Sequence, residues 1–160
     1  ILMGQSKSQL RAAVRDFYED YAAILDADRV KEWPAFFTED ALYQVISRES
    51  HSQGLTHATI YCNGIRMIRD RGAAIRQTAV FEQRVIRHFI SNVQAVEEGR
   101  EIRAGANFLL IESMYDSEPQ VLMVGEYIDV LVRDGESFKL KQRSAVYDNY
   151  RVRTTLVLPV

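Results

Sequence analysis

Hydrophobic positions in the first part of the chain recur at helical spacing. Side chains three and four residues apart lie on one face of an α-helix, so this stripe predicts an amphipathic helix with one buried face. Ser6 and Gln9 stand before the stripe at capping-box spacing, in which each side chain satisfies a backbone donor at the helix start. The stripe consists of Leu10, Ala13, Val14, Phe17, Tyr18, Tyr21, Ile24 and Leu25.

Three further segments follow before the pattern changes. A short helix is expected through Val30 and Trp33, and residues 41–47 have the pattern of a short strand. The apolar positions in 56–71 predict a second long helix. Gly72 is expected to end it, because glycine readily adopts the backbone conformation that closes a helix.

Period-two alternation replaces helical spacing in the second half of the chain, and it predicts strands with one buried and one wetter face. Asp134-Gly135 indicates a tight hairpin turn. Alternation along the last strand places Lys141 and Arg143 on its outer face, where they could pair with carboxylates of a neighbouring copy. The predicted strands are 80–90, 102–115, 121–133 and 137–147. In the third, Leu122, Val124, Ile128, Val130 and Val132 are expected to share a face.

Helices first and a run of antiparallel strands second define an α+β fold. A long, strongly twisted sheet that curls around helices forms a cone, and such a cone has room for a pocket between helices and sheet. The length of 160 residues fits one domain, 1–160, in which residues 1–6 are expected to be a flexible tail.

Composition and net charge limit the classes of partner that the sequence predicts. The net charge of -2 and the hydrophobic fraction of 47% are ordinary for a soluble globular protein, and they give no electrostatic reason to expect nucleic acid or a membrane as partner. No apolar run approaches the length of a membrane span. The single cysteine, Cys62, cannot form an internal disulfide, so the chain is expected in a reducing cytoplasm.

Metal chemistry finds little support in the sequence. The histidines are His51, His57 and His88, and none stands at a spacing typical of metal ligands. A Rieske cluster needs two cysteines and two histidines, so this chain cannot hold one alone. We assign it no metal ligand and no catalytic residue.

Acid–base chemistry is the sharper possibility. A buried Asp or His beside a tyrosine could act as base and oxyanion donor. The simpler reading is that the rings pack in the core and satisfy their hydroxyls by hydrogen bonds. The pocket candidates are Tyr18, Trp33, Tyr43, Tyr127 and Asp129, and Tyr21, His88 and Asp148 could project into the same space.

Four segments together resemble the small β subunits of aromatic-ring-hydroxylating (Rieske-type) dioxygenases. Residues 33–43, WPAFFTEDALY, resemble the segment after the first helix, and residues 84–92 resemble an R-x-x-R-H-x-x-S-N strand. Residues 125–129, GEYID, and the loop 49–55 resemble the branch that acts on carboxylated aromatics such as terephthalate and salicylate. The resemblance extends from about residue 17 to the end of the sequence.

The resemblance implies a cystatin-like (NTF2-like) cone and assembly with a catalytic α subunit, commonly as an α3β3 hexamer around a trimeric core. The α subunit would carry the Rieske [2Fe-2S] cluster and mononuclear Fe(II), fed from NAD(P)H through a reductase, with a benzoate-like substrate. It transfers no catalytic residue to this chain. Arg84, Arg87, His88 and Asn92 carry over as a structural or interface motif.

Two other functions fit the same fold. A stand-alone isomerase, dehydratase or cyclase would need an open polar cavity, and an interior filled by side chains such as Trp33, Phe36 and Met67 would argue against it. A ligand-binding or transport adaptor would need an exposed apolar groove.

Overall fold

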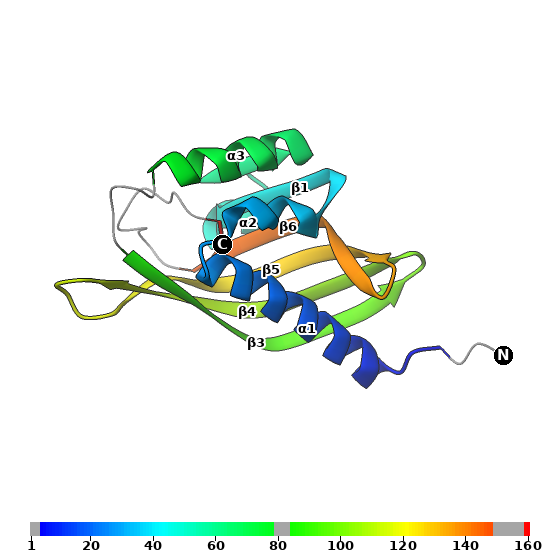
Figure 1. Ribbon diagram of the computed structural model, residues 1–160. Helices are drawn as coiled ribbons and strands as arrows, with labels where there is room; N and C mark the ends of the chain where they lie inside the picture. Colours follow the sequence, from blue (N-terminus) through cyan, green and yellow to red (C-terminus); the bar gives the residue numbers. More distant parts are fainter. Residues whose placement is uncertain (1–3, 79–83, 149–158) are drawn as a thin grey trace.

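The computed structural model describes residues 4–78, 84–148 and 159–160, and Figure 1 shows helices lying over one face of a curved sheet. Its elements in chain order are α1 (Lys7–Asp26), the 3-10 helix η1 (Val30–Phe36), β1 (Phe37–Ser47), α2 (Arg48–Ser52), β2 (Ile60–Asn63), α3 (Ile65–Thr78), β3 (Arg84–Glu98), β4 (Glu101–Met114), β5 (Gln120–Asp134) and β6 (Ser137–Tyr147).

The strands form one six-stranded sheet in the order β2-β1-β6-β5-β4-β3. Every pair is antiparallel except β1 with β6, which is parallel. Helix α1 packs mainly on β3, while α3 packs on η1, β1 and β2. The predicted α+β architecture is confirmed, with one parallel pair that the alternation pattern did not reveal.

Helix α1 forms where its apolar stripe predicts it. The capping box is present: the backbone N–H of Gln9 donates to Ser6 Oγ at 3.2 Å, and the Ser6 N–H donates to Gln9 Oε1 at 2.9 Å. One face is buried against the sheet, and each large apolar side chain buried there contributes roughly 1.5–3 kcal/mol. The buried residues are Leu10, Val14, Phe17, Tyr18, Tyr21 and Ala22.

The helix predicted for 56–71 is correct only from Ile65 onward, where α3 begins. Residues Ile60–Asn63 form strand β2 instead, with Cys62 directly opposite Tyr43 of β1. Ile60 and Cys62 are buried while the residues between and after them are exposed, which is strand periodicity rather than helical periodicity. Gly64 then takes a φ of +93°, a conformation open to glycine, and the chain turns into α3.

Gly72 does not end the helix, because α3 continues to Thr78. A side chain added at Gly72 would meet Val30 and Trp33 at 3.6–3.7 Å. These are ordinary van der Waals distances, so neither helix termination nor the packing of α3 on η1 requires glycine at this position.

Strand β6 departs from simple alternation, and this corrects the position of Arg143. Leu131 pairs with Leu140, but Val130 pairs with Gln142, so Lys141 is an extra residue in the ladder. A one-residue bulge moves the following side chains to the other face. Arg143 therefore points into the protein with an exposed fraction of 0%, while Lys141 remains on the outside.

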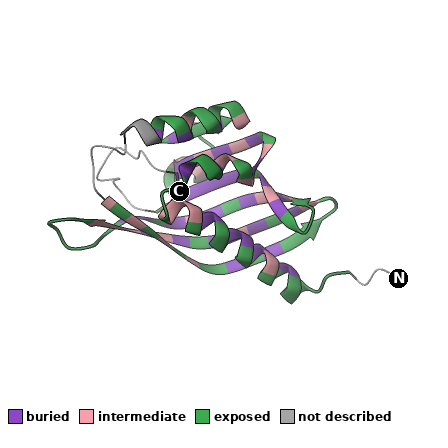
Figure 2. Ribbon diagram, viewed as in Figure 1, coloured by how far each residue is buried: buried purple, intermediate pink, exposed green. Residues whose placement is uncertain are grey.

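The other predicted strands form with shifted bounds. Strand β1 begins at Phe37, before the predicted start, and β3 continues through Glu98, while positions 80–83 of its predicted range lie outside the described residues. The face shared by Val124, Ile128, Val130 and Val132 is the outer face of β5. Leu122 was expected on the same face but is buried in the core, because the register with β4 shifts at this residue. Figure 2 shows the resulting alternation of buried and exposed residues along the strands.

Candidate functional site

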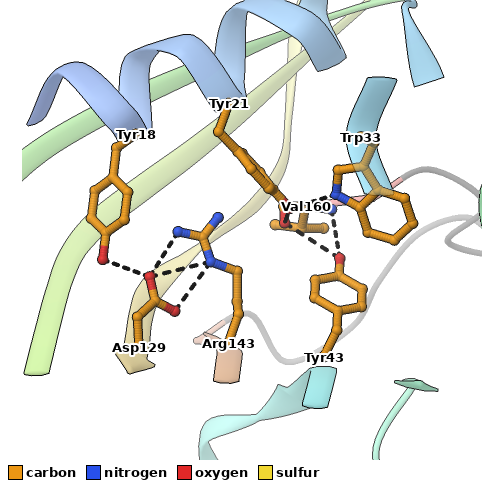
Figure 3. A network of polar contacts seen from close by, with 7 residues as sticks. All are labelled: Tyr18, Tyr21, Trp33, Tyr43, Asp129, Arg143 and Val160. Carbon is orange, nitrogen blue, oxygen red and sulfur yellow. Dashed lines mark hydrogen bonds and ion pairs between the residues drawn. The ribbon is translucent and has the colours of Figure 1, made fainter. Parts of the chain in front are cut away.

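An ion pair lies at the centre of the protein, between β5, β6 and α1 (Figure 3). Arg143 Nη2 donates to Asp129 Oδ2 at 2.7 Å, and its Nε donates to Oδ1 at 3.1 Å. The Tyr18 hydroxyl donates to Asp129 Oδ2 at 2.5 Å. Both charged side chains have an exposed fraction of 0%, so the pair is sealed from solvent within the described structure.

Aromatic rings enclose the guanidinium of Arg143. Its central carbon lies 3.6 Å from the ring centroid of Tyr127, 4.4 Å from that of Tyr21 and 5.0 Å from that of Tyr18. A cation held over aromatic faces is attracted by their quadrupoles, most strongly where water is excluded. Arg143 Nη1 has no hydrogen-bond partner in the described part of the chain, so these ring contacts are what compensates its burial.

The electrostatics favour a fixed charge pair over a proton-transfer site. Burial raises the pKa of Asp129, and Arg143 opposes that rise. Burial works against the charge on Arg143, but Asp129 and the facing tyrosines offset it and hold its pKa well above its usual value. Burial also raises the pKa of Tyr18, so its phenol stays protonated and donates.

A second polar cluster adjoins the first and surrounds Val160 (Figure 3). Tyr21 Oη donates to the Val160 carbonyl oxygen at 2.9 Å, and the Val160 N–H donates to Tyr43 Oη at 2.9 Å. Trp33 Nε1 donates to Tyr21 Oη at 2.9 Å. We call Tyr21, Trp33 and Tyr43 the aromatic cage; its three side chains come from α1, η1 and β1, and each is buried.

All five pocket candidates therefore lie inside the protein, but they are split between two tasks. Tyr18 and Asp129 meet as a tyrosine–carboxylate pair, and Tyr127 covers the arginine. Trp33 and Tyr43 belong to the aromatic cage. Tyr18 and Asp129 could have formed an acid–base pair, but Arg143 forms an ion pair with Asp129 in the core. This arrangement suits a structural role.

The R-x-x-R-H motif on β3 divides between two faces. Arg84 pairs with Glu112 at 3.1 Å, and both side chains are 12% exposed. His88 Nδ1 lies 2.6 Å from Asp26 Oδ1 at the end of α1, and its backbone N–H donates to the same carboxylate. Arg87 lies on the opposite, outer face and is exposed. Asn92 adopts a φ of +54° beside a bulge.

Two other candidates lie outside the interior. Asp148 is exposed and accepts from Arg48 Nε at 2.8 Å, so its expected place in the pocket is wrong. Met67 is 45% exposed and does not fill the interior, whereas Trp33 is fully buried and Phe36 packs against the core.

An open groove of about 520 Å³ lies between η1, α3 and the start of β1. Its walls are apolar in part, and Lys31, Arg69 and Lys139 stand around it with the single carboxylate of Glu39. Within residues 4–78, 84–148 and 159–160, no three His, Cys, Asp or Glu side chains are grouped to hold a metal ion. Among the described helices, none is long and apolar enough to cross a membrane.

Three residues of these clusters were missed or misplaced by sequence reasoning. The bulge that turns Arg143 inward leaves no composition signal. Asp26 follows the helical stripe directly and was assigned no role. Val160 reaches the aromatic cage from the far end of the sequence, and no local pattern indicates such a contact.

The fold is a cystatin-like (NTF2-like) cone with a buried ion pair at its centre. A structure from Novosphingobium aromaticivorans reported as a scytalone dehydratase shares this fold, with a TM-score of 0.66 at 20% identity over 89% of each chain. A second structure from the same organism, reported as an aromatic-ring-hydroxylating dioxygenase β subunit, is closer, with a TM-score of 0.85 and 33% identity over 94% of this chain and 97% of that one.

Sequence comparisons agree with the second structure. The family model described as "Ring hydroxylating beta subunit" matches residues 20–154. The anthranilate 1,2-dioxygenase small subunit of Burkholderia cepacia is 32% identical over 88% of each chain. A terephthalate 1,2-dioxygenase β subunit of Comamonas sp. is 30% identical over 90% of this chain and 94% of that one. The chain belongs to the ring-hydroxylating β subunit family and is a subunit of a multicomponent dioxygenase.

Proposed function

We propose that this chain forms the structural core of an α3β3 dioxygenase that hydroxylates a benzoate-like aromatic carboxylate in the cytoplasm. The observation that carries the structural role is the buried ion pair of Asp129 and Arg143, which the Tyr18 hydroxyl and the surrounding tyrosine rings hold in place. The matched relatives act on anthranilate and terephthalate, which are both aromatic carboxylates, and this supports the substrate class.

The redox centres belong to the α partner in this proposal. The whole sequence contains one cysteine and three histidines, which do not fit the two cysteines and two histidines of a Rieske cluster. The [2Fe-2S] cluster and the mononuclear iron would therefore be held by the α subunit, with electrons from NAD(P)H through a reductase. This chain would supply shape and contact surface.

Its outer sheet surface suits contact with neighbouring copies. Phe89 is 56% exposed beside the exposed Arg87, and Val124 is 41% exposed on β5. Leu109 lies between Phe89 and Val124 in the ladder. Exposed apolar patches flanked by charge are typical of surfaces covered in an assembly, and a closed ring of heterologous contacts would give a trimer.

The test is assembly with and without the α subunit. Expressed alone, the chain should sediment as a trimer, contain no stoichiometric iron and leave benzoate-type acids unchanged. Co-expression with a Rieske-type α subunit from the same organism should give a larger complex that turns the substrate over. Turnover of an aromatic acid by the isolated chain, or failure to bind that partner, would refute the proposal.

The groove between η1 and α3 supports a second candidate, a ligand-binding adaptor. Three cationic side chains beside apolar walls would suit a small organic anion. A binding screen with benzoate-type anions on the isolated trimer decides this, and Arg69→Glu should abolish any hit that uses the groove.

A further inference from the structure

The open groove between η1, α3 and β1 combines apolar walls with positive charge. Lys31, Arg69 and Lys139 line it from η1, α3 and β6, and Glu39 is the one carboxylate among the described lining residues. Three cations against one carboxylate make the groove positive in a chain whose net charge is -2. A negatively charged partner would therefore be attracted to this place in particular.

The three cations of the groove are not engaged with carboxylates of their own chain. Lys141, two residues along β6 from Lys139, pairs with Glu101. Among the described residues, none forms an ion pair with Lys31, Arg69 or Lys139. A partner's carboxylate could thus pair with them without breaking an existing ion pair.

The positive surface continues from the groove along α3. The sequence of this helix contains four arginines and one acidic residue, Asp70. Arg66 and Arg69 are both exposed on it. Arginine is favoured at protein interfaces, because its planar guanidinium can pair with a carboxylate through two hydrogen bonds and can stack on other flat groups. A protein segment would contact the groove and this helix together.

The shape of the groove favours a protein segment over a free small anion. The groove has a volume of about 520 Å³ and is open to solvent. Sites for small ligands typically bury about 70–90% of the ligand surface, which an open groove does not do for an ion of the size of benzoate. It can instead receive one side chain of a larger surface, as pockets at the centre of protein interfaces do.

A second copy of this chain fits the groove less well. The surface proposed for self-association includes β3, which forms one edge of the sheet, whereas α3 packs beside β1 and β2 at the other edge (Figure 1). That surface carries the exposed cation Arg87 beside Phe89, so it would bring like charge to the groove. The observations therefore favour a partner of another kind.

We propose that this groove anchors the catalytic α subunit, through an α-subunit segment that carries an Asp or Glu carboxylate next to an apolar side chain. The carboxylate pairs with Arg69 and the neighbouring lysines, and the apolar side chain packs against Pro34 and Ala35. The inference rests on the proposed assembly with an α subunit, and it adds the surface and the chemistry by which that subunit is recognised.

The first test reverses one charge of the groove. This chain, as wild type or as Arg69→Glu, is co-expressed with a Rieske-type α subunit from the same organism, and dissociation of the complex on dilution is followed by sedimentation velocity. The variant should raise the apparent dissociation constant about tenfold or more and weaken its dependence on salt, because an attractive pair becomes a repulsive one. The matched control is Arg15→Glu, an exposed cation on α1, which should dissociate like wild type.

A second variant tests the apolar part of the groove. Ala73 is exposed on α3 and lines the groove, so Ala73→Trp occupies the space with an indole and leaves the cations in place. The complex should again dissociate about tenfold or more readily. Ala12→Trp, at an exposed position on α1, should leave it unchanged. Thermal unfolding of each variant chain shows whether it is folded, and both groove positions are exposed enough to tolerate the change.

The outcomes separate this inference from the proposed function. If the wild-type chain forms no complex with the α subunit, the proposed function fails and this inference fails with it. If the wild-type complex forms and both folded groove variants keep its stability, this inference alone is refuted. Groove variants that lose only self-association would assign the groove to a second copy, and variants that lose only binding of free benzoate would make it a small-anion site. Both results would contradict the proposal.

Discussion

The two faces of the central strands differ in an unexpected way: charged side chains lie on the buried inner face, and large apolar side chains lie on the exposed outer face. The inner face holds a charged pair, Asp129 and Arg143, each with a side chain that is 0% exposed. The outer face of the same sheet exposes Phe89 and Val124, with Leu109 directly between them in the ladder. A charged pair is therefore buried within a mostly apolar core, while apolar side chains are exposed on the outer face.

The two faces differ in how far contacts within the described chain satisfy their side chains. Inside, the carboxylate accepts from Arg143 and from Tyr18, and aromatic rings cover the cation. Outside, Phe89 and Val124 are 56% and 41% exposed. The buried ion pair stabilises this subunit from within, and the outer surface is the part that we propose other chains cover.

Arg143→Met should have the largest effect, because it leaves the Asp129 carboxylate buried without its cation. Breaking a buried pair on one side typically costs about 3–5 kcal/mol. Urea denaturation of the isolated chain measures this loss. A variant that unfolded at the wild-type urea midpoint would show that the ion pair does not stabilise the interior.

A matched triple variant sharpens the same test. Arg143→Met with Asp129→Leu and Tyr18→Phe replaces the whole network by apolar side chains of similar size. Such replacement is often close to neutral, so the triple variant should recover most of the stability that the single variant loses. A triple variant as unstable as the single one would show that packing, rather than unpaired charge, explains the loss.

Gly125→Ala should come next, since the interior has no spare room at that strand. A Cβ there would lie 1.9 Å from the carbonyl oxygen of Val146 on β6, so the two strands would have to separate. Overpacking of this kind costs about 1–3 kcal/mol. Thermal unfolding checks it against Gly4→Ala, where an added Cβ meets nothing within 4 Å.

Alkaline pH should weaken the inner face selectively. Burial raises the pKa of Tyr18, Tyr21, Tyr43 and Tyr127 above their ordinary value of about 10. The unfolded chain therefore loses phenolic protons that the folded chain keeps, and stability present below about pH 10 falls as the pH rises further. Each phenol contributes at most about 1.4 kcal/mol per pH unit.

The measurement is the urea midpoint between pH 8 and pH 11, compared between wild type and Tyr18→Phe. The variant should lose less stability per pH unit than the wild type, because one fewer phenol is protected. Parallel curves would mean that Tyr18 ionises as easily in the folded chain as in the unfolded one.

Much of the outer framework could be predicted from the sequence. The stripe of α1, its capping box and the period-two strands are local signals, and Asp134-Gly135 forms the expected turn between β5 and β6. The helix expected across 56–71 begins only at Ile65. Strand β2 was missed because it has only four residues, and its period-two pattern is hidden within a longer run of apolar positions.

The interior resisted prediction for a different reason. Counting back from the hairpin turn, regular alternation pairs Asp129 with Gln142, and only the bulge at Lys141 brings Arg143 opposite it. The ion pair thus depends on one backbone irregularity, and the Val160 contact depends on closure of the chain over its whole length. Neither is a property of a local segment.

Arg87→Glu should have the smallest effect on folding and a clear effect on assembly. Arg87 is exposed on the outer face, where surface substitutions usually change stability by less than about 0.5 kcal/mol. If the row of Phe89, Leu109 and Val124 is covered by another copy, reversing the charge beside it should lower the trimer fraction in sedimentation velocity. The matched control is Arg15→Glu, an exposed charge on α1. An intact trimer in the Arg87 variant would place the contact elsewhere, and the outer face would then be apolar without serving self-association.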